Sequence, residues 1–148
     1  MIQFGDPKPG LTYRDRPAAF GVAVRDGQIA LARISGAGAG AAGYDLPGGA
    51  IDAGESETEA LAREFTEETG LKVRAGALLG RAGQYFIKAD GAPLNNLCAL
   101  YAVEILGHDP DAKREDDHEL VWLDPAEAIA RLKHEAHAWG VLRWLRQR

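Results

Sequence analysis

Residues 48–71 read G-G-A-I-D-A-G-E-S-E-T-E-A-L-A-R-E-F-T-E-E-T-G-L, and the rest of the chain is interpreted outward from this stretch. Its first seven positions hold three glycines, which give the backbone the freedom for a tight, irregular loop. Residues 57–69 then contain neither Gly nor Pro and are rich in helix-forming side chains. Ser56 and Glu59 have the spacing of a capping box, and Gly70 suits the position after a helix end. The stretch therefore predicts a loop that leads directly into one helix.

Six glutamates crowd this stretch, and Arg63 is the single basic residue among them. At 100° per residue, Glu64, Glu67 and Glu68 form one stripe of the helix, beside an apolar stripe that contains Leu61. Glu64 and Glu68 are an i, i+4 like-charge pair, which costs about a few tenths of a kcal/mol in water and more when partly buried. A divalent cation would remove that cost, and Mg²⁺ prefers a few carboxylates together with substrate phosphates. The stripe is thus a candidate metal site, and the alternative is an ordinary solvated acidic face.

The fixed positions of the stretch resemble the Nudix box. The pattern is matched from end to end by Gly49, Glu55, Arg63, Glu64, Glu67, Glu68, Gly70 and Leu71. Phe65 stands where the family usually carries an aliphatic residue, a difference that concerns core packing and not chemistry. The resemblance implies the Nudix fold, an α/β/α sandwich with a mixed β-sheet between helices, and membership of the Nudix hydrolase family. We expect the whole chain, residues 1–148, to form one such domain.

The resemblance also implies roles for residues of the box. The expected metal ligands are the backbone carbonyl of Gly49 and the carboxylates of Glu64, Glu67 and Glu68. The expected metal is Mg²⁺, with Mn²⁺ as a possible substitute. Arg63 is expected to orient the carboxylates through a bridge within the box, to Glu55. Cations are needed because the charge of a pyrophosphate repels an incoming hydroxide, so the expected enzyme is a metal-dependent pyrophosphohydrolase.

The residue that takes the proton from water stays open between two glutamates. Glu64 lies inside the box, whereas Glu119 stands where several family members carry an acidic residue outside it. Asp116, Asp117 and His118 are neighbours that offer alternatives. We assign catalytic roles to both glutamates and to the arginine of the box.

The composition limits the classes of function. With 148 residues the chain is long enough for one domain and too short for two. A formal net charge of −5 gives no basic footprint, so no nucleic-acid polymer is expected as a partner. Cys98 is the single cysteine, which excludes a disulfide framework and fits a reducing compartment. Because no apolar run approaches twenty residues and no signal peptide is evident, we expect a cytoplasmic protein with no membrane partner.

The segments before the box predict an arm, a hairpin and a loop. Residues 1–19 contain three prolines and several charges, and they are expected to form an extended N-terminal arm. Residues 20–24 and 28–34 are rich in β-forming side chains and are joined by an Asp-Gly pair at Asp26, which predicts a hairpin. Residues 35–43 are low in complexity and predict a mobile loop, either a plain surface loop or one that closes over substrate.

The segments after the box predict further strands and a helical end. Residues 73–89 alternate loosely and carry glycines, as bent or bulged strands do, and residues 97–106 are apolar enough for a central strand. Residues 118–123 predict a short strand. Asp124 and the proline after it begin a helical region that is either one helix or two joined near His134. This order of elements predicts an α+β fold with a mixed sheet and helices on both sides.

Substrate contacts are expected from Arg16, Tyr85 and Phe86. The two aromatic rings suit stacking on a base, although either would also suit a core. The extra signatures of the ADP-ribose and NADH subfamilies are absent near the box, so the default substrate is a nucleoside triphosphate or a nucleotide sugar. A non-nucleotide diphosphate and a catalytically silent binding or regulatory module remain as alternatives. The expected partner is therefore a small molecule, and the expected assembly is a monomer or a homodimer.

His134 and His137 are spaced i, i+3, which also suits two ligands of a transition metal. Glu135 is the one acidic residue beside them, and it would point elsewhere on a helix. We therefore expect no metal at this pair.

Overall fold

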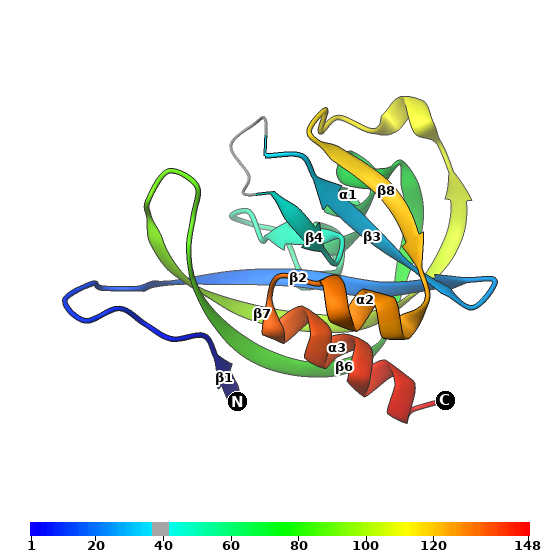
Figure 1. The fold of residues 1–148 in the computed structure, drawn as a ribbon. Helices are drawn as coiled ribbons and strands as arrows, with labels where there is room; N and C mark the ends of the chain where they lie inside the picture. The colour runs from blue at the N-terminus through cyan, green and yellow to red at the C-terminus, as the bar shows by residue number, and fades with distance from the viewer. Residues whose placement is uncertain (37–41) are drawn as a thin grey trace.

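A computed structural model describes residues 1–36 and 42–148 of the chain. In Figure 1 the strands form the middle of the molecule, with α1 on one side and α2 and α3 on the other. The elements, in chain order, are β1 (Ile2–Phe4), β2 (Arg14–Arg25), β3 (Gln28–Ile34), β4 (Gly43–Asp45), β5 (Gly48–Ala50), α1 (Glu57–Thr69), β6 (Leu71–Ile87), β7 (Pro93–His108), the 3₁₀ turn η1 (Pro110–Ala112), β8 (His118–Leu123), α2 (Pro125–Arg131) and α3 (Glu135–Arg146). This arrangement confirms the α+β sandwich with a mixed sheet.

The sheet opens where β2 and β3 part. These strands form the predicted hairpin, but their antiparallel pairing is limited to Val24 with Ile29 and Arg25 with Gln28. Beyond the turn, β2 pairs in parallel with β7 and takes β5 on its other edge, whereas β3 pairs with β4 and β8. The full order is β1-β6-β7-β2-β3-β4, with β5 on β2 and β8 on β3. The short link from β4 to β5 therefore passes from one half of the sheet to the other.

Helix α1 is closed at both ends as its sequence predicts. The Ser56 side chain accepts the Glu59 N–H at 3.1 Å, and the Glu59 carboxylate accepts the Ser56 N–H at 3.0 Å. Gly70 follows with a φ of 80°, a left-handed conformation that glycine adopts at little cost. Leu61 and Phe65 are fully buried against the sheet. When this apolar face packs on the sheet, the neighbouring carboxylates Glu64 and Glu68 come to lie against β5.

The second helical layer comes from two helices, which settles the alternative left open by the sequence. Leu132 ends α2 in an extended conformation, and α3 begins only after His134. Ala136 and Val141 of α3 are fully buried in the core on this side. Within the described residues, no helix is long and apolar enough to cross a membrane.

The N-terminal segment differs from the expected arm. β1 pairs with β6, and β2 begins at Arg14, so that Ala18 and Ala19 are fully buried. The reason is a parallel ladder of ten residue pairs with β7, a long-range contact that local pattern does not reveal. The sequence did not indicate a strand here because it carries Arg14, Asp15 and Pro17, and charged residues and proline are uncommon in strands. The predicted loop at residues 35–43 lies largely outside the described residues.

The bulged region after the box is a single long strand. β6 pairs with β7 from Leu71 to Ile87, with register shifts between Lys72 and Val73 and on both sides of Leu78. β7 lies between β6 and β2, which confirms its central place.

Candidate active site

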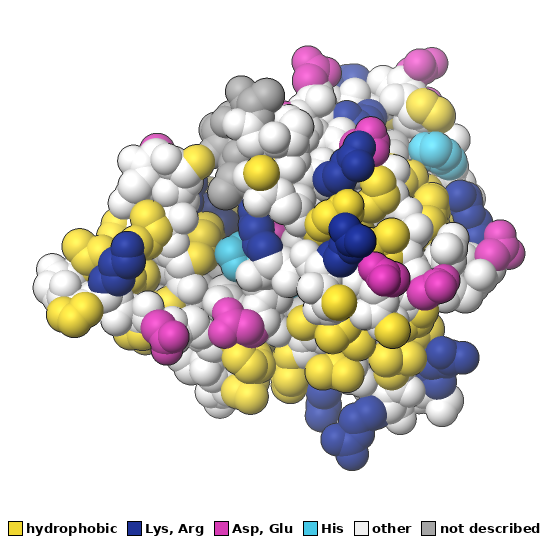
Figure 2. Space-filling model, in the orientation of Figure 1, with side chains coloured by type: hydrophobic (Ala, Val, Ile, Leu, Met, Phe, Trp, Pro, Cys, Tyr) yellow, Lys and Arg dark blue, Asp and Glu magenta, His cyan; other side chains and the backbone are white. Residues whose placement is uncertain are grey.

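A cavity of about 750 Å³ opens beside the link from β4 to β5. Its wall includes Glu64 and Glu68 of α1 and, from other elements, Asp45, His134 and Phe86. Figure 2 shows this side of the molecule, with a histidine and basic side chains set in a recess of the surface. The cavity thus brings the carboxylates of the box together with residues that lie far from them in the chain.

Glu68 is the most enclosed carboxylate of the stripe. It is 8% exposed, and its Oε1 accepts the Gly48 N–H at 3.3 Å. Burial, and after it the charge of Glu64, raises the pKa of Glu68 well above its usual value. Burial also raises the pKa of Glu64, although Arg63 opposes the shift. A bound cation would relieve the repulsion between two such crowded and largely buried carboxylates.

Gly49 is needed for the close approach of Glu64. A Cβ at Gly49 would lie 2.9 Å from the carboxyl carbon of Glu64 and 3.0 Å from one of its oxygens. Any side chain at this position would push the carboxylate away. The backbone of Gly49 and the Glu64 carboxylate therefore share one small space, as two ligands of the same ion would.

Arg63 ties the loop to the helix. Its Nε and Nη2 donate to the two oxygens of Glu55 at 2.7 and 2.9 Å, and Nη2 also donates to the Ala50 carbonyl at 3.3 Å. Its Nη1 donates to Glu64 at 3.0 Å and to Glu67 at 3.2 Å. Hydrogen bonding to this guanidinium lowers the pKa of Glu55 to about 2 and raises the pKa of Arg63. The geometry is that of an orienting residue, which holds the carboxylates that flank it.

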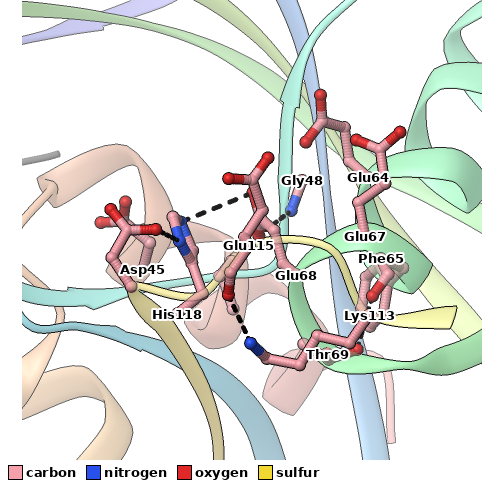
Figure 3. A network of polar contacts seen from close by, with 12 residues as sticks. Asp45, Gly48, Glu64, Phe65, Glu67, Glu68, Thr69, Lys113, Glu115 and His118 are labelled. Atoms are coloured by element: carbon pink, nitrogen blue, oxygen red, sulfur yellow. Dashed lines mark hydrogen bonds and ion pairs between the residues drawn. The ribbon is translucent and has the colours of Figure 1, made fainter. Parts of the chain in front are cut away.

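The donor set suits a hard divalent cation. Glu64, Glu67, Glu68 and the Gly49 carbonyl offer only oxygen, the ligand type of Mg²⁺ and Mn²⁺. A second group, Glu115, Asp117 and His118, holds ligand atoms that all lie within 4.8 Å of one another. Figure 3 shows Glu64 and Glu67 on one side of Glu68, and His118 and Asp45 on the other. Two groups of metal-compatible side chains therefore border one carboxylate.

β8 presents His118, and not Glu119, to the cavity. His118 Nε2 lies 3.9 Å from Glu68 Oε2, and its Nδ1 lies 2.8 Å from Asp117 Oδ1. Glu119 points to the other face of the strand, where its 58% exposed side chain pairs with Arg33 at 2.5 Å. Successive strand residues face opposite sides, so one residue decides which side chain enters. The structure does not bring Glu119 to the other candidate residues.

Of the three candidate substrate residues, two lie together at the cavity and the ring of the third packs elsewhere. Arg16 Nε donates to Asn96 Oδ1 at 2.8 Å, and the guanidinium lies 5.7 Å from the centre of the Phe86 ring. Tyr85 also borders the cavity, but its ring packs edge-on against Tyr13 at 5.2 Å between centroids. The structure therefore joins Arg16 with Phe86 and turns the Tyr85 ring toward the N-terminal segment.

Three further cavity residues were not assigned to the site from sequence. Asp45, His134 and His137 all border the cavity, although His134 lies 89 positions after Asp45 in the chain. His137 is 1% exposed and accepts the Leu46 N–H at Nδ1. Burial lowers the pKa of His134 and of His137 and raises that of Asp45. Nothing local in the sequence signals this meeting, because it depends on how α3 docks against the sheet.

Comparison with known proteins gives the family. Residues 15–145 match the model of the NUDIX domain. A Mycobacterium tuberculosis (strain CDC 1551 / Oshkosh) protein named "Putative 8-oxo-dGTP diphosphatase 2" is 42% identical over 86 residues, which cover 57% of this chain and 55% of that relative. The chain thus spans about half the length of this relative. CTP pyrophosphohydrolase of Escherichia coli (strain K12) is 27% identical over 105 residues, 71% of this chain and 73% of that protein.

Solved structures agree on the fold. A NUDIX hydrolase from Nitrosomonas europaea superposes with a TM-score of 0.75 at 21% identity, covering 90% of each chain. At this identity the likeness shows the fold alone. Because the domain match spans most of the chain, and includes the loop, the helix and most residues of the cavity described above, the protein belongs to the Nudix hydrolase family.

Proposed function

We propose that this chain is a Mg²⁺-dependent pyrophosphohydrolase that cleaves a nucleoside diphosphate linked to another moiety. The observation that carries the proposal is the enclosed pair Glu64 and Glu68, whose pKa values are both raised, beside a cavity large enough for a nucleotide. Arg63 and the Gly48 N–H hold this pair in place. Placing two carboxylates this close together costs free energy, and a cation bound with substrate phosphates would offset that cost.

The residues of the chain take distinct roles in this proposal. Glu64, Glu67, Glu68 and the Gly49 carbonyl would hold Mg²⁺, for which Mn²⁺ can substitute. A divalent cation bound there neutralises phosphate charge and lowers the pKa of a water molecule. Arg63 fixes the carboxylates in one geometry, which saves the cost of ordering them during the reaction. Glu64 is the better placed of the two candidate bases, because Glu119 lies outside the cavity.

Substrate contacts fit a nucleotide. The Arg16 guanidinium carries positive charge beside the cavity, and Phe86 offers a ring for a base to contact. The names of the two relatives refer to 8-oxo-dGTP and to CTP, so nucleoside triphosphates come first among the candidates. A nucleotide sugar is the other candidate within the same reaction class. The formal charge of −5 speaks against a nucleic-acid polymer as substrate.

The wider setting is also proposed from the chain. We expect one domain over residues 1–148, in the cytoplasm, as a monomer or homodimer. The single cysteine, Cys98, is buried and unpaired, which suits a reducing compartment.

The test is an assay with Mg²⁺ and Mn²⁺ that follows loss of the substrate and appearance of nucleoside monophosphate by chromatography, together with pyrophosphate release from the triphosphates. The panel holds nucleoside triphosphates, nucleotide sugars, dinucleoside polyphosphates and coenzyme A. Turnover of one class is expected, with loss of at least about a hundredfold in Glu67→Gln, since a metal ligand is removed. Glu104→Gln is the matched control, because Glu104 is exposed, pairs with Arg74 of β6 and does not line the cavity. If every compound stays intact with both metals, the proposal fails.

A further inference from the structure

The two residues between β4 and β5, Leu46 and Pro47, form a link that is bound by a histidine of the last helix. The Leu46 N–H donates to His137 Nδ1 at 3.2 Å, across 91 positions of the chain. Because a backbone N–H can only donate, this ring nitrogen carries no proton and the imidazole is neutral. His137 is 1% exposed, and burial lowers its pKa well below the usual value. The imidazole therefore stays an acceptor for the link at neutral pH.

The start of α3, which carries His137, is itself fixed to two strands. The Lys133 N–H donates to the Tyr44 carbonyl of β4 at 3.1 Å. The Ala136 N–H donates to Oε1 of the buried Gln84 of β6 at 2.9 Å. These bonds hold the first turn of the helix against the sheet, so the imidazole is a fixed point to which the link is attached.

The other end of the link carries groups of the candidate metal site. Gly48 comes directly after the link, and its N–H donates to Glu68 Oε1 at 3.3 Å. The carbonyl of the next residue, Gly49, is an expected ligand of the metal. Pro47 has a fixed φ and restricts the residue before it, so the link holds few soft dihedrals. A displacement of Leu46 therefore reaches Gly48 and Gly49 with little loss.

Loss of the imidazole acceptor would cause such a displacement. Leu46 is fully buried, and a buried N–H without a partner costs more free energy than an ordinary hydrogen bond contributes. The main chain can lower that cost only by moving the N–H toward another acceptor. The Gly21 N–H of β2 donates to the Pro47 carbonyl at 3.1 Å and holds the middle of the link. The link would then turn about this bond, which also moves the end that leads to Gly48.

We propose that His137 is a positioning residue of the metal site, which acts through the link on the Gly49 carbonyl and on the Gly48 N–H that orients Glu68. This inference rests on the proposed metal-dependent function and adds to it a residue far outside the Nudix box. Partners that orient metal ligands typically contribute about 10–100-fold to metal affinity. Because His137 acts through the main chain, we expect the lower end of this range.

Variants of His137 separate this role from simple packing. His137→Asn keeps an acceptor at about the place of Nδ1, although it buries an amide and leaves a cavity. His137→Leu fills the space with apolar atoms and offers no acceptor. His137→Phe also lacks an acceptor and keeps a ring beside Phe20, so it replaces the leucine variant if that variant does not fold. Val141→Ala is the control for destabilisation, because Val141 is a fully buried residue of α3 that does not line the cavity.

The first measurement is the affinity for Mn²⁺ without substrate, from electron paramagnetic resonance of the free ion. His137→Leu is expected to bind Mn²⁺ about tenfold more weakly than the wild type, whereas His137→Asn and Val141→Ala should stay within about twofold. Melting temperatures should follow a different order, since the asparagine and alanine variants lose more packing than the leucine variant does.

The second measurement is amide hydrogen exchange in metal-free protein, which does not depend on a bound ion. The Gly48 N–H should exchange at least about tenfold faster in His137→Leu than in the wild type. The Gly70 N–H, which donates to the Thr66 carbonyl at the end of α1, reports general loosening and should change much less.

Unchanged Mn²⁺ affinity or unchanged Gly48 exchange in His137→Leu would overturn the inference. Affinities that follow the melting temperatures of the variants would also overturn it, because packing alone would then explain them. Hydrolysis by the wild type, together with either of these results, refutes the inference and leaves the proposed function standing. If the wild type binds no Mn²⁺ and hydrolyses nothing, the proposed function fails, and the inference fails with it.

Discussion

Arg63 donates to both oxygens of Glu55, at 2.7 and 2.9 Å, across eight residues of sequence. The two parallel bonds fix the loop before α1 against the helix that bears the metal-compatible carboxylates. The same guanidinium also reaches Glu64 and Glu67. The loop and the carboxylates therefore keep one relative geometry through a single side chain, and its replacement should disturb both.

Arg63→Lys should lower kcat by about ten to a hundredfold and shift the melting temperature only slightly. Lysine keeps the charge but lacks the planar fork that bonds several carboxylates at once. Steady-state kinetics on the substrate found by the panel measures the effect. Arg74→Lys, at an exposed pair with Glu104, is the control and should retain full activity. A kcat within twofold of wild type in Arg63→Lys would show that the fork is dispensable.

Glu119→Gln should leave kcat within about twofold, whereas His118→Ala should lower it by about tenfold or more. His118 borders the cavity and faces Glu68 at 3.9 Å, while Glu119 is exposed and bonded to Arg33. Both variants are compared under identical metal and pH, with thermal unfolding as a check on folding. The opposite order of effects would restore Glu119 as the base and contradict the side-chain directions on β8.

Glu57→Gln should destabilise the protein at neutral pH by about 1 kcal/mol, or about 2–4 °C in melting temperature. Glu57 accepts hydrogen bonds from Arg81 at 3.0 Å and Tyr101 at 2.6 Å, and chiefly Arg81 lowers its pKa below the usual 4.5. A lowered folded-state pKa means that the unfolded chain binds more protons in acid. The stabilisation is therefore complete well above pH 4.5 and is lost as the pH falls through the folded-state pKa.

Melting curves of wild type and Glu57→Gln from pH 3.5 to 8 measure this dependence. The difference should stay constant down to about pH 5.5 and shrink in more acidic buffer. Glu127→Gln, in an exposed i, i+4 pair with Arg131, serves as control with a change within about 0.5 kcal/mol. A gap between wild type and variant that widens in acid would refute the assignment.

Cys98 should resist thiol reagents in the folded protein. It is 1% exposed, and burial raises the pKa of its thiol to about 12. At pH 8 so little thiolate forms that reaction should be at least about a thousandfold slower than for free cysteine. A colorimetric disulfide reagent follows the reaction, and one thiol per chain should appear on unfolding in guanidinium. Rapid labelling of native protein would show that β7 opens readily.

The features that were predicted correctly are those formed by residues close to one another in the chain. The reciprocal bonds of Ser56 and Glu59, and the Asp-Gly turn at Asp26, are formed by neighbours in the chain and follow from spacing. The family resemblance covered residues of one loop and one helix, which lie together for the same reason. Long-range pairing escaped such signals, as with the start of β2 at Arg14.

The sequence could not decide which residue of β8 faces the cavity, nor which residues α3 brings to it. A shift of one residue along β8 decides between His118 and Glu119, and no pattern in a strand of this length fixes that parity. Asp45 and His137, 92 positions apart in the chain, come near each other only when α3 docks against the sheet. Such contacts depend on how whole elements pack, so they emerge only in three dimensions.

The Leu46–Pro47 link between β4 and β5 is held by main-chain donors on both sides. The Leu46 N–H reaches His137, and the Gly48 N–H reaches Glu68. Every residue except proline carries such a donor, so these anchors survive exchange of the side chain that precedes or follows them. Side-chain substitutions along the link can therefore accumulate over evolution while its main chain keeps its place between His137 and Glu68.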